Sequence, residues 1–322
     1  MRFSRIFVTI AVGIAASLVG LGFWLHGFSR KATPGSTFPL PLVALNPKKP
    51  LALPAPPPFH FPDGGETLVP NYRLVALYGK PDAPALGALG QQPMDATIAR
   101  VKDLAASYQT FSTTPIMPTL EIITTLASSS PTSNNDYSNE ADPVTLQPWI
   151  DAARAAGVYV VLDLQPGRAS FLAQAEEYES LLKQPNVGLA LDPEWRVGPA
   201  QVPLKQIGSV SIDEVNATDD WLATLTAQNK LPQKLFVLQE FRSSMLPNRT
   251  ALDTSHKELA YVVQMDGQGA QSVKSATWRA ILQQPPGNVQ FGWKNFYVKD
   301  SPVLTPQQTM ALTPQPYYVS YE

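Results

Sequence analysis

The chain has 322 residues, a formal net charge of −2 at pH 7 and no cysteine. Its composition excludes disulfides, thiolate metal sites and a cysteine nucleophile, and it gives none of the clustered basic surface that nucleic-acid binding requires. Only three histidines occur, His26, His60 and His256, so a metal site built from several histidines is not expected. The sequence predicts neither a metal nor another cofactor.

Residues 7–25, FVTIAVGIAASLVGLGFWL, form an apolar run without a charged residue. At about 1.5 Å per residue, a helix of this length nearly spans a bilayer core of roughly 30 Å. A cleavable signal peptide is the alternative, although its apolar region would be shorter. We therefore expect residues 1–31 to be a transmembrane anchor or a signal peptide. The protein is then either a single-pass protein of the cell membrane with an extracytoplasmic body, or it is secreted after cleavage.

Residues 32–70 are rich in proline, with 11 prolines in the 38 positions of residues 33–70. Proline favours the extended polyproline II conformation, which makes such a segment a semi-rigid spacer. We expect residues 32–70 to be a linker between the membrane segment and a folded domain at residues 71–322.

Short apolar runs alternate with helical patterns throughout residues 71–322. The runs are rich in Val, Leu, Ile and aromatic residues, as is typical of buried parallel strands. They lie at residues 73–79, 117–124, 158–167, 187–196, 207–211, 234–242, 259–267 and 289–297. The helical patterns lie at residues 93–109, 144–157, 170–185, 213–230 and 270–284.

Eight strands alternating with helices predict a (β/α)8 TIM barrel, an α/β fold, with a doubly wound open sheet as the alternative. The open sheet would normally carry a glycine-rich phosphate-binding turn after its first strand. Residues 78–90, YGKPDAPALGALG, lack that pattern, which favours the barrel.

Acidic and amide residues gather at the ends of the predicted strands, where barrel enzymes carry their active sites. The candidate catalytic residues are Glu194, Asp192, Glu240 and Asp266. The candidate substrate-binding residues are Glu121, Asp163, Gln165, Trp195, Arg196, Gln239, Trp293 and Lys294. Because side chains alternate along a strand, Asp192 and Glu194 are expected on one face.

Closely spaced carboxyl groups repel one another, so one of them tends to hold a proton at neutral pH, as a general acid must. Glycoside hydrolysis uses such a pair of carboxyl groups. On this hypothesis Glu194 is the acid and Asp192 its partner, and either Glu240 or Asp266 is the nucleophile of a retaining reaction.

Two other interpretations of these acids stay open. The basic residues Arg196, Arg242 and Lys294 could neutralise the acids as ion pairs, which would make the cluster structural. Alternatively, carboxylate oxygens of the cluster could bind a hard cation.

The segment LALDPEW, residues 189–195, resembles the D-x-E that ends strand four in family 18 chitinase-like glycoside hydrolases. The resemblance implies that Glu194 is the general acid, that Asp192 orients an acetamido group of the substrate, and that Trp293 forms the aromatic floor of the sugar site. The sequence departs from the family where Gly188 and Ala190 stand at the positions of two earlier aspartates.

Residues 72–322 also resemble a group of exported actinobacterial proteins described as hypothetical or lipoprotein-like. The shared segments are ALDPEWR, EVN, PQKL and DG. This resemblance implies export and no particular activity.

The sequence therefore leaves two functions open. One is a membrane-tethered glycoside hydrolase that acts on a cell-envelope or environmental glycan. The other is a non-catalytic barrel that binds a glycan or a protein. The expected partners are a glycan and, through the N-terminal helix, the membrane. The polar loop at residues 128–142, which follows the second predicted strand, is a candidate lid over the site.

Overall fold

The computed structural model describes residue 59 and residues 61–322. The predicted membrane segment at residues 7–25 and most of the predicted linker lie outside the described residues. Within the described part of the chain, no helix has both the length and the apolar character needed to cross a membrane.

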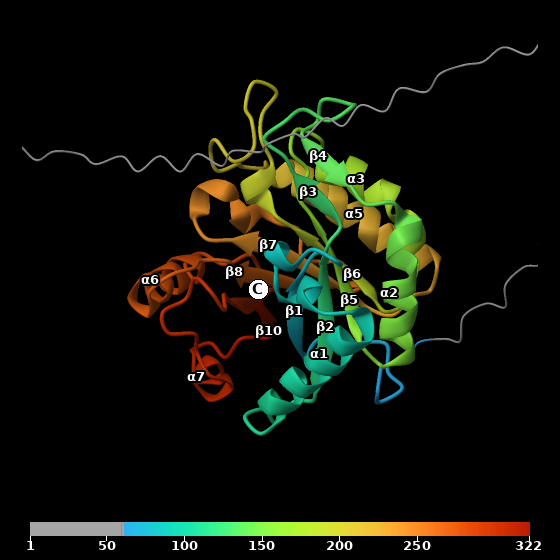
Figure 1. Ribbon diagram of the computed structural model, residues 1–322, viewed down its shortest axis with the longest axis vertical. Helices are drawn as coiled ribbons and strands as arrows, with labels where there is room; N and C mark the ends of the chain where they lie inside the picture. Colours follow the sequence, from blue (N-terminus) through green and yellow to red (C-terminus); the bar gives the residue numbers. More distant parts are fainter. Residues whose placement is uncertain (1–58, 60) are drawn as a thin grey trace, which may run out of the picture. The chain divides into compact units, whose positions relative to one another are not determined.

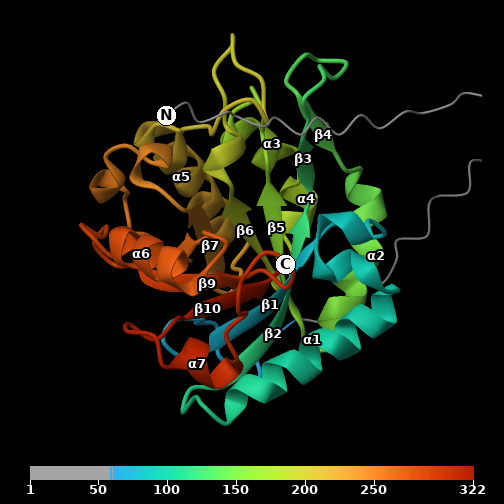
Figure 2. The ribbon, with the colours of Figure 1, turned by 60° about the vertical axis from the view of Figure 1, so that its left-hand side comes forward.

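Among the described residues, eight parallel strands close into a barrel, which confirms the predicted α/β barrel (Figures 1 and 2). Each strand pairs with the next barrel strand in the sequence, and the last pairs with the first. The strands are β1 (Arg73–Gly79), β2 (Ile116–Ile123), β5 (Tyr159–Leu164), β6 (Val187–Leu191), β7 (Lys234–Glu240), β8 (Leu259–Met265), β9 (Gln290–Asn295) and β10 (Tyr318–Tyr321).

One predicted strand was wrong, and one strand of the barrel was not predicted. Residues 207–211 form no strand, because their backbone closes the loop after β6: the Gly208 N–H donates to the carbonyl of Glu194 at 2.6 Å. The predicted eighth strand, residues 289–297, corresponds to β9 and is the seventh in the barrel. The eighth is β10, a run of four residues that the sequence analysis missed.

Helices cover the outer face of the barrel (Figure 2). They are α1 (Met94–Gln109), α2 (Pro143–Ala155), α3 (Phe171–Glu177), α4 (Glu179–Leu182), α5 (Ile212–Gln228), α6 (Gln271–Ile281) and α7 (Pro306–Met310). The helix predicted at residues 170–185 is thus divided into α3 and α4. Between β7 and β8, residues 241–258 carry two short 3₁₀ turns, η4 (Ser243–Met245) and η5 (Arg249–Ala251), in place of a long helix.

Local sequence signals set the ends of several helices. The Ser211 hydroxyl accepts a hydrogen bond from the backbone N–H of Glu214 at 3.2 Å, so Ser211 caps α5 as expected. Gly157 follows α2 with a φ of +70°, a backbone conformation that glycine adopts without strain.

An apolar core lies inside the barrel at the amino ends of the strands. The segment that precedes β1 covers this core. Phe61 and Leu68, from the described end of the predicted linker, are fully buried and pack in this core. The Gln233 side-chain oxygen accepts hydrogen bonds from the backbone N–H groups of Leu68 and Val69 at 2.9 and 3.0 Å. Residues 61–70 therefore belong to the barrel, and the predicted boundary at residue 71 lies too late.

Inward-facing side chains change from apolar to polar along the strands. On β7, Leu235 and Val237 belong to the apolar core, whereas Gln239 bonds to buried carboxylates. Gly188 faces the crowded part of this core, where a Cβ atom would lie 2.6 Å from the carbonyl oxygen of Leu235. A side chain has no room at that position, which explains why glycine stands where the chitinase-like pattern has an aspartate.

Candidate active site

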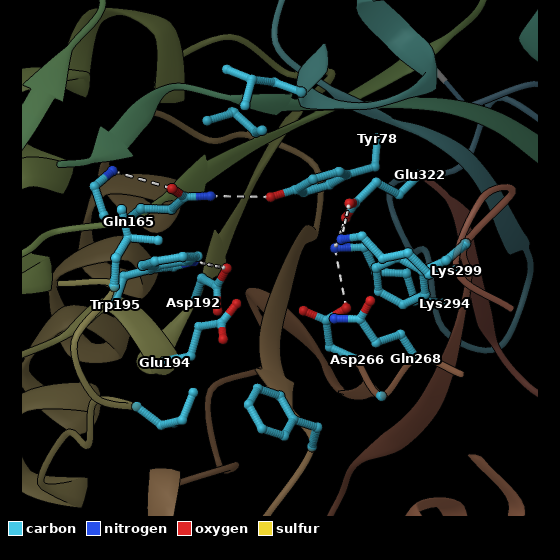
Figure 3. Close-up of a pocket in the computed structure, with 18 of the residues that line it drawn as sticks. Tyr78, Gln165, Asp192, Glu194, Trp195, Asp266, Gln268, Lys294, Lys299 and Glu322 are labelled. Carbon is cyan, nitrogen blue, oxygen red and sulfur yellow. Dashed lines mark hydrogen bonds and ion pairs between the residues drawn. The ribbon is translucent and has the colours of Figure 1, made fainter. Parts of the chain in front are cut away.

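A cavity of about 690 Å³ lies at the carboxyl ends of the barrel strands (Figure 3). The apolar part of its lining includes Leu86, Leu126, Leu204, Ile207, Phe241 and Phe296. The polar part of its lining consists of Tyr78, Gln165, Asp192, Glu194, Trp195, Asp266, Gln268, Lys294, Lys299 and Glu322. The cavity has the size of a small-molecule site, with an apolar wall and a few converging charged groups.

Three of the predicted catalytic residues meet in this cavity. Asp192, Glu194 and Asp266 each place one carboxylate oxygen within 4.8 Å of the other two. Figure 3 shows Asp192 and Glu194 facing Asp266 and Lys294. Strand alternation is not the cause, because β6 already ends at Leu191 and Glu194 lies in the 3₁₀ turn η3 (Pro193–Trp195). This turn directs Asp192 and Glu194 toward Asp266, which directly follows β8.

Asp192 is 2% exposed and is held by its neighbour in the turn. The indole N–H of Trp195 donates to Asp192 Oδ2 at 2.9 Å, and within the described residues Oδ1 has no hydrogen-bond donor. Burial raises the pKa of Asp192 well above its usual range, and the nearby Glu194 adds to the shift. Both effects favour the protonated form of Asp192.

Glu194 has a pKa close to neutral pH, so both its protonated and its ionised form are populated at pH 7. Burial raises its pKa to about 7, and the negative charge of Asp266 acts in the same direction. Lys294 partly offsets both effects. A carboxyl group with this pKa holds a proton for about half of the time at neutral pH, as a general acid requires.

Lys294 supplies the positive charge of the site. It projects inward from β9, and its Nζ lies 3.1 Å from Asp266 Oδ1 and 3.1 Å from Glu322 Oε2. Burial alone would lower the pKa of Lys294, but these carboxylates outweigh burial and hold it well above its usual value. Burial raises the pKa of Asp266, and the adjacent Lys294 ammonium opposes that rise. Within the described residues, Asp266 is the one acid of the three with an ammonium group in contact.

Beneath the cavity lies a buried polar network that contains three predicted substrate-binding residues. Gln239 donates to Asp163 Oδ1 at 2.8 Å and to Glu121 Oε1 at 3.3 Å. The hydroxyl of Tyr318 donates to Glu121 and that of Tyr78 donates to Asp163. Glu121, Asp163 and Gln239 are fully buried, and none of them lines the cavity. Their predicted role in substrate binding is therefore corrected: they lie beneath the cavity and support it.

Burial raises the pKa of Glu121 to about 8 and that of Asp163 to about 7, while Lys294 lowers both. Because Lys294 lines the cavity, the network is coupled electrostatically to the cavity. Gln165 differs from these residues, because it does line the cavity. Its side chain joins the hydroxyl of Tyr78 to the backbone N–H of Ala127.

Ala127 ends the first strand of a hairpin formed by β3 (Thr125–Ala127) and β4 (Ser138–Glu140), which carries most of the candidate lid loop. Leu126 and Ala127 line the cavity. The hairpin thus forms part of the cavity wall, and its opening and closing stays a prediction.

Glu240 and Trp293 lie outside the cavity. Each directly precedes or follows an inward-facing residue on its strand, so its own side chain points to the outside of the barrel. Glu240 forms a buried ion pair with Arg249 on the outer face of the barrel. Trp293 packs against Trp278 with ring centroids 5.7 Å apart. Their predicted roles, as a nucleophile and as the aromatic floor of a sugar site, are therefore corrected.

Arg196 also lies outside the cavity lining, and it does not neutralise the acids. Its guanidinium forms two hydrogen bonds with Glu214, at 2.9 and 3.1 Å. Because its side chain is engaged by Arg196, Glu214 forms no reciprocal hydrogen bond to the backbone of the capping residue Ser211. Trp195, in contrast, lines the cavity as predicted.

Four polar residues of the cavity, Tyr78, Gln268, Lys299 and Glu322, were not among the predicted site residues. Tyr78 could have been found, because alternation along the first predicted strand places it on the inward face with Leu74 and Ala76. Glu322 lies directly after β10, the missed strand, and Lys299 and Gln268 lie in loops. The loop residues carry no motif that would have identified them.

The three acids also offer oxygens to a hard cation, since their ligand atoms are close enough together to share one. However, Lys294 already provides Asp266 with a positive charge at 3.1 Å. A cation at this position would have to compete with the ammonium group.

No protein-family model matches the sequence, and no curated protein matches it. A solved structure of a GH113 β-1,4-mannanase is similar over 78% of this chain and 87% of that chain, with 9% sequence identity and a TM-score of 0.38. The assignment of the barrel fold depends on the strand pairing and not on this similarity.

Proposed function

We propose that the barrel is a glycoside hydrolase in which Glu194 is the general acid and base and Asp266 is the nucleophile. The observation that carries the proposal is the convergence of Asp192, Glu194 and Asp266 beside Lys294 in one cavity. The sequence resemblance to chitinase-like enzymes assigns the same role to Glu194.

The environments of Glu194 and Asp266 assign them different roles. Glu194 has a pKa of about 7 because it is buried, and it has no ammonium group in contact among the described residues, so it can donate a proton. Asp266 is paired with Lys294, which stabilises its anion. Pairs of carboxyl groups whose environments differ in this way are typical of acid and nucleophile assignments.

The proximity of the acids is compatible with a retaining reaction. Retaining enzymes hold the two carboxyl groups about 5–5.5 Å apart, whereas inverting enzymes keep them about 6.5–9.5 Å apart to accommodate a water molecule. One oxygen of Glu194 and one of Asp266 lie within 4.8 Å of each other, so the two groups are close enough to act on the same bond. Asp266 would then attack the anomeric carbon while Glu194 protonates the departing oxygen, and water activated by Glu194 would release the sugar.

The neighbouring residues support these roles. Asp192 lies beside the acid, and its Oδ1 atom has no hydrogen-bond partner among the described residues, so it is free to contact a bound sugar. Trp195 is fixed by its hydrogen bond to Asp192, and Phe241 and Phe296 line the same cavity. These aromatic groups would provide apolar faces for a sugar ring.

The proposed substrate is a glycan of the cell envelope or the environment, and the proposed location is the outer side of the cell membrane. Support comes from the apolar run at residues 7–25 and the proline-rich segment that follows it. The test is fractionation of cells that express the full chain. Recovery in the membrane fraction after an alkaline wash supports the tether, and recovery of a shortened chain in the medium supports signal cleavage.

The enzymatic proposal is tested by comparing the wild type with Glu194→Gln on a panel of polysaccharides and on aryl glycosides. The matched control is Glu176→Gln, at an exposed position of α3. We expect Glu194→Gln to lose about 10²- to 10⁴-fold in kcat/KM on polysaccharides, and less on aryl glycosides whose leaving groups need no proton. The control variant should match the wild type.

Equal activity of Glu194→Gln and the wild type would remove Glu194 as the acid. A wild type that binds a glycan and hydrolyses none would instead support the non-catalytic barrel. Loss of activity with EDTA, restored by a divalent cation, would support metal-assisted hydrolysis at the same acids.

A further inference from the structure

A second cluster of potential metal ligands lies outside the cavity. It consists of Asp219 and Asp220 on α5 and His256 in the segment that leads into β8. One ligand atom of each residue lies within 4.8 Å of the other two. None of the three lines the cavity, so the proposed hydrolysis makes no use of them.

Asp219 is the buried member of the cluster, with a side chain 0% exposed. The hydroxyl of Tyr261, on β8, donates to Asp219 Oδ1 at 2.8 Å and fixes the carboxylate. Within the described residues, Oδ2 has no hydrogen-bond donor, and it lies 3.9 Å from the Nε2 atom of His256. A buried carboxylate oxygen without a partner is costly, and such groups commonly indicate a missing ligand or ion.

His256 presents the same ring nitrogen to both aspartates. Its Nε2 atom lies 2.8 Å from Asp220 Oδ1. Asp253 adds a third negative charge near the imidazole. Three carboxyl groups around a single imidazole provide more oxygen ligands than the imidazole can pair with, and a divalent cation could bind the oxygens that are left.

We propose that Asp219, Asp220 and His256 form a zinc site. Zinc binds imidazole nitrogen and carboxylate oxygen at about 2.0–2.2 Å in a tetrahedron, which sets the distance between the ligand atoms. The distances from His256 Nε2 to the two carboxylates are 2.8 and 3.9 Å, one shorter and one longer than the edge of such a tetrahedron, so binding of zinc requires shifts of a few tenths of an ångström in these side chains. Asp220 is 64% exposed, so water can take the fourth position.

The ligand set favours zinc over calcium or magnesium. Calcium and magnesium prefer six or more oxygen ligands, whereas an imidazole in a set of three protein ligands suits a transition metal. The Tyr261 hydroxyl orients the buried carboxylate, as partners of metal ligands commonly do. A metal at this place would join α5 to residues 241–258, which contain His256 and carry no long helix.

The test uses the full chain, stripped of metal with EDTA and then dialysed. Zinc chloride is titrated by calorimetry into the wild type, His256→Gln and Asp219→Asn. Asp213→Asn, at an exposed position of the same helix, is the matched control. His26 and His60 occur in every variant, so any zinc bound by these two histidines is the same in all of them and does not affect the comparison.

We expect the wild type and the control to bind one more zinc ion per chain than the other two variants. Zinc in 100-fold excess over Kd should raise their unfolding midpoints by about 5 °C or more, and should not raise those of His256→Gln or Asp219→Asn to the same extent. Tyr261→Phe should weaken zinc binding by about 10- to 100-fold without abolishing it.

Identical zinc stoichiometry in the wild type and His256→Gln would overturn the proposal. Tighter binding of calcium than of zinc would overturn the assignment of the metal. Because His256 is partly exposed, its variant should fold even if Asp219→Asn does not. The cavity acids are intact in all variants, so the outcome does not depend on the proposed hydrolase activity.

Discussion

Replacing Lys294 with methionine removes the positive charge of the cavity while keeping a side chain of similar length. Lys294 is 2% exposed and lies 3.1 Å from an oxygen of both Asp266 and Glu322. The variant therefore leaves the buried Asp266 and the partly buried Glu322 without their shared cation. We expect a large loss of stability at neutral pH.

The size of the loss follows from the geometry. At 3.1 Å and an effective dielectric constant of about 20, each ion pair has a Coulomb energy of roughly 5 kcal/mol. Removal of the lysine also removes the cost of burying it, so the net loss is about 3–5 kcal/mol, as for other broken buried pairs. For a domain of this size the unfolding midpoint should fall by roughly 6–20 °C.

The loss should also depend on pH, and the sign follows from Glu322. Burial alone would raise the pKa of Glu322, but Lys294 and Lys299 hold it below its usual value. A carboxylate with a lowered pKa contributes stability above its unfolded pKa and loses it as the pH falls through the folded pKa. The difference between the wild type and Lys294→Met should therefore shrink as the pH falls below about 4.

The assay is urea unfolding at pH 7 and at about pH 3, below the unfolded pKa of Glu322, with Lys299→Met as the matched control. Lys299 also pairs with Glu322, at 3.2 Å, but its side chain is 50% exposed. A pair of that kind contributes about 0–1 kcal/mol. If Lys294→Met cost no more than Lys299→Met at pH 7, the account of Lys294 as the cation of the site would be refuted.

Three further predictions concern activity and stability. With Glu194 at a pKa of about 7, kcat/KM should fall as the pH rises above about 7, and Glu194→Gln should lack this limb of the pH–rate profile. Glu240→Gln should keep the wild-type kcat, because this residue faces away from the cavity, yet lower the free energy of unfolding by about 3–5 kcal/mol by leaving its buried arginine partner unpaired. Phe61→Ala should cost about 3–5 kcal/mol in urea unfolding, because Phe61 is buried at the amino ends of the strands, whereas Phe111→Ala, at an exposed position, should cost about 0.5 kcal/mol or less.

The barrel could be predicted for two reasons. Strands buried on both faces appear in the sequence as apolar runs, and in the helices between them the apolar residues recur with the period of an α-helix. The error at residues 207–211 has a physical cause, since an apolar loop that closes onto the barrel resembles a short strand in composition. The last strand, β10, is four residues long, too short to show a pattern.

The site was predicted in part, because its acids follow clearly apolar strands. Asp192, Glu194 and Asp266 do meet, yet the turn that directs Glu194 inward could not be inferred from alternation. The misplacement of Glu240 and Trp293 arose because residues that follow one another at a strand end face opposite sides. Which of two adjacent polar residues faces inward depends on the register of the whole strand, and that is known only once the barrel is closed.

The most direct test of the proposed function is mass spectrometry of the protein after reaction with a fluorinated glycoside that slows the release of the sugar. The glycoside should carry the sugar of whichever glycan the wild type hydrolyses. We predict one added glycosyl group per chain, on the peptide that contains Asp266, and none in Asp266→Asn. A label on another carboxylate, or hydrolysis with inversion and no label, would contradict the assignment of Asp266 as the nucleophile.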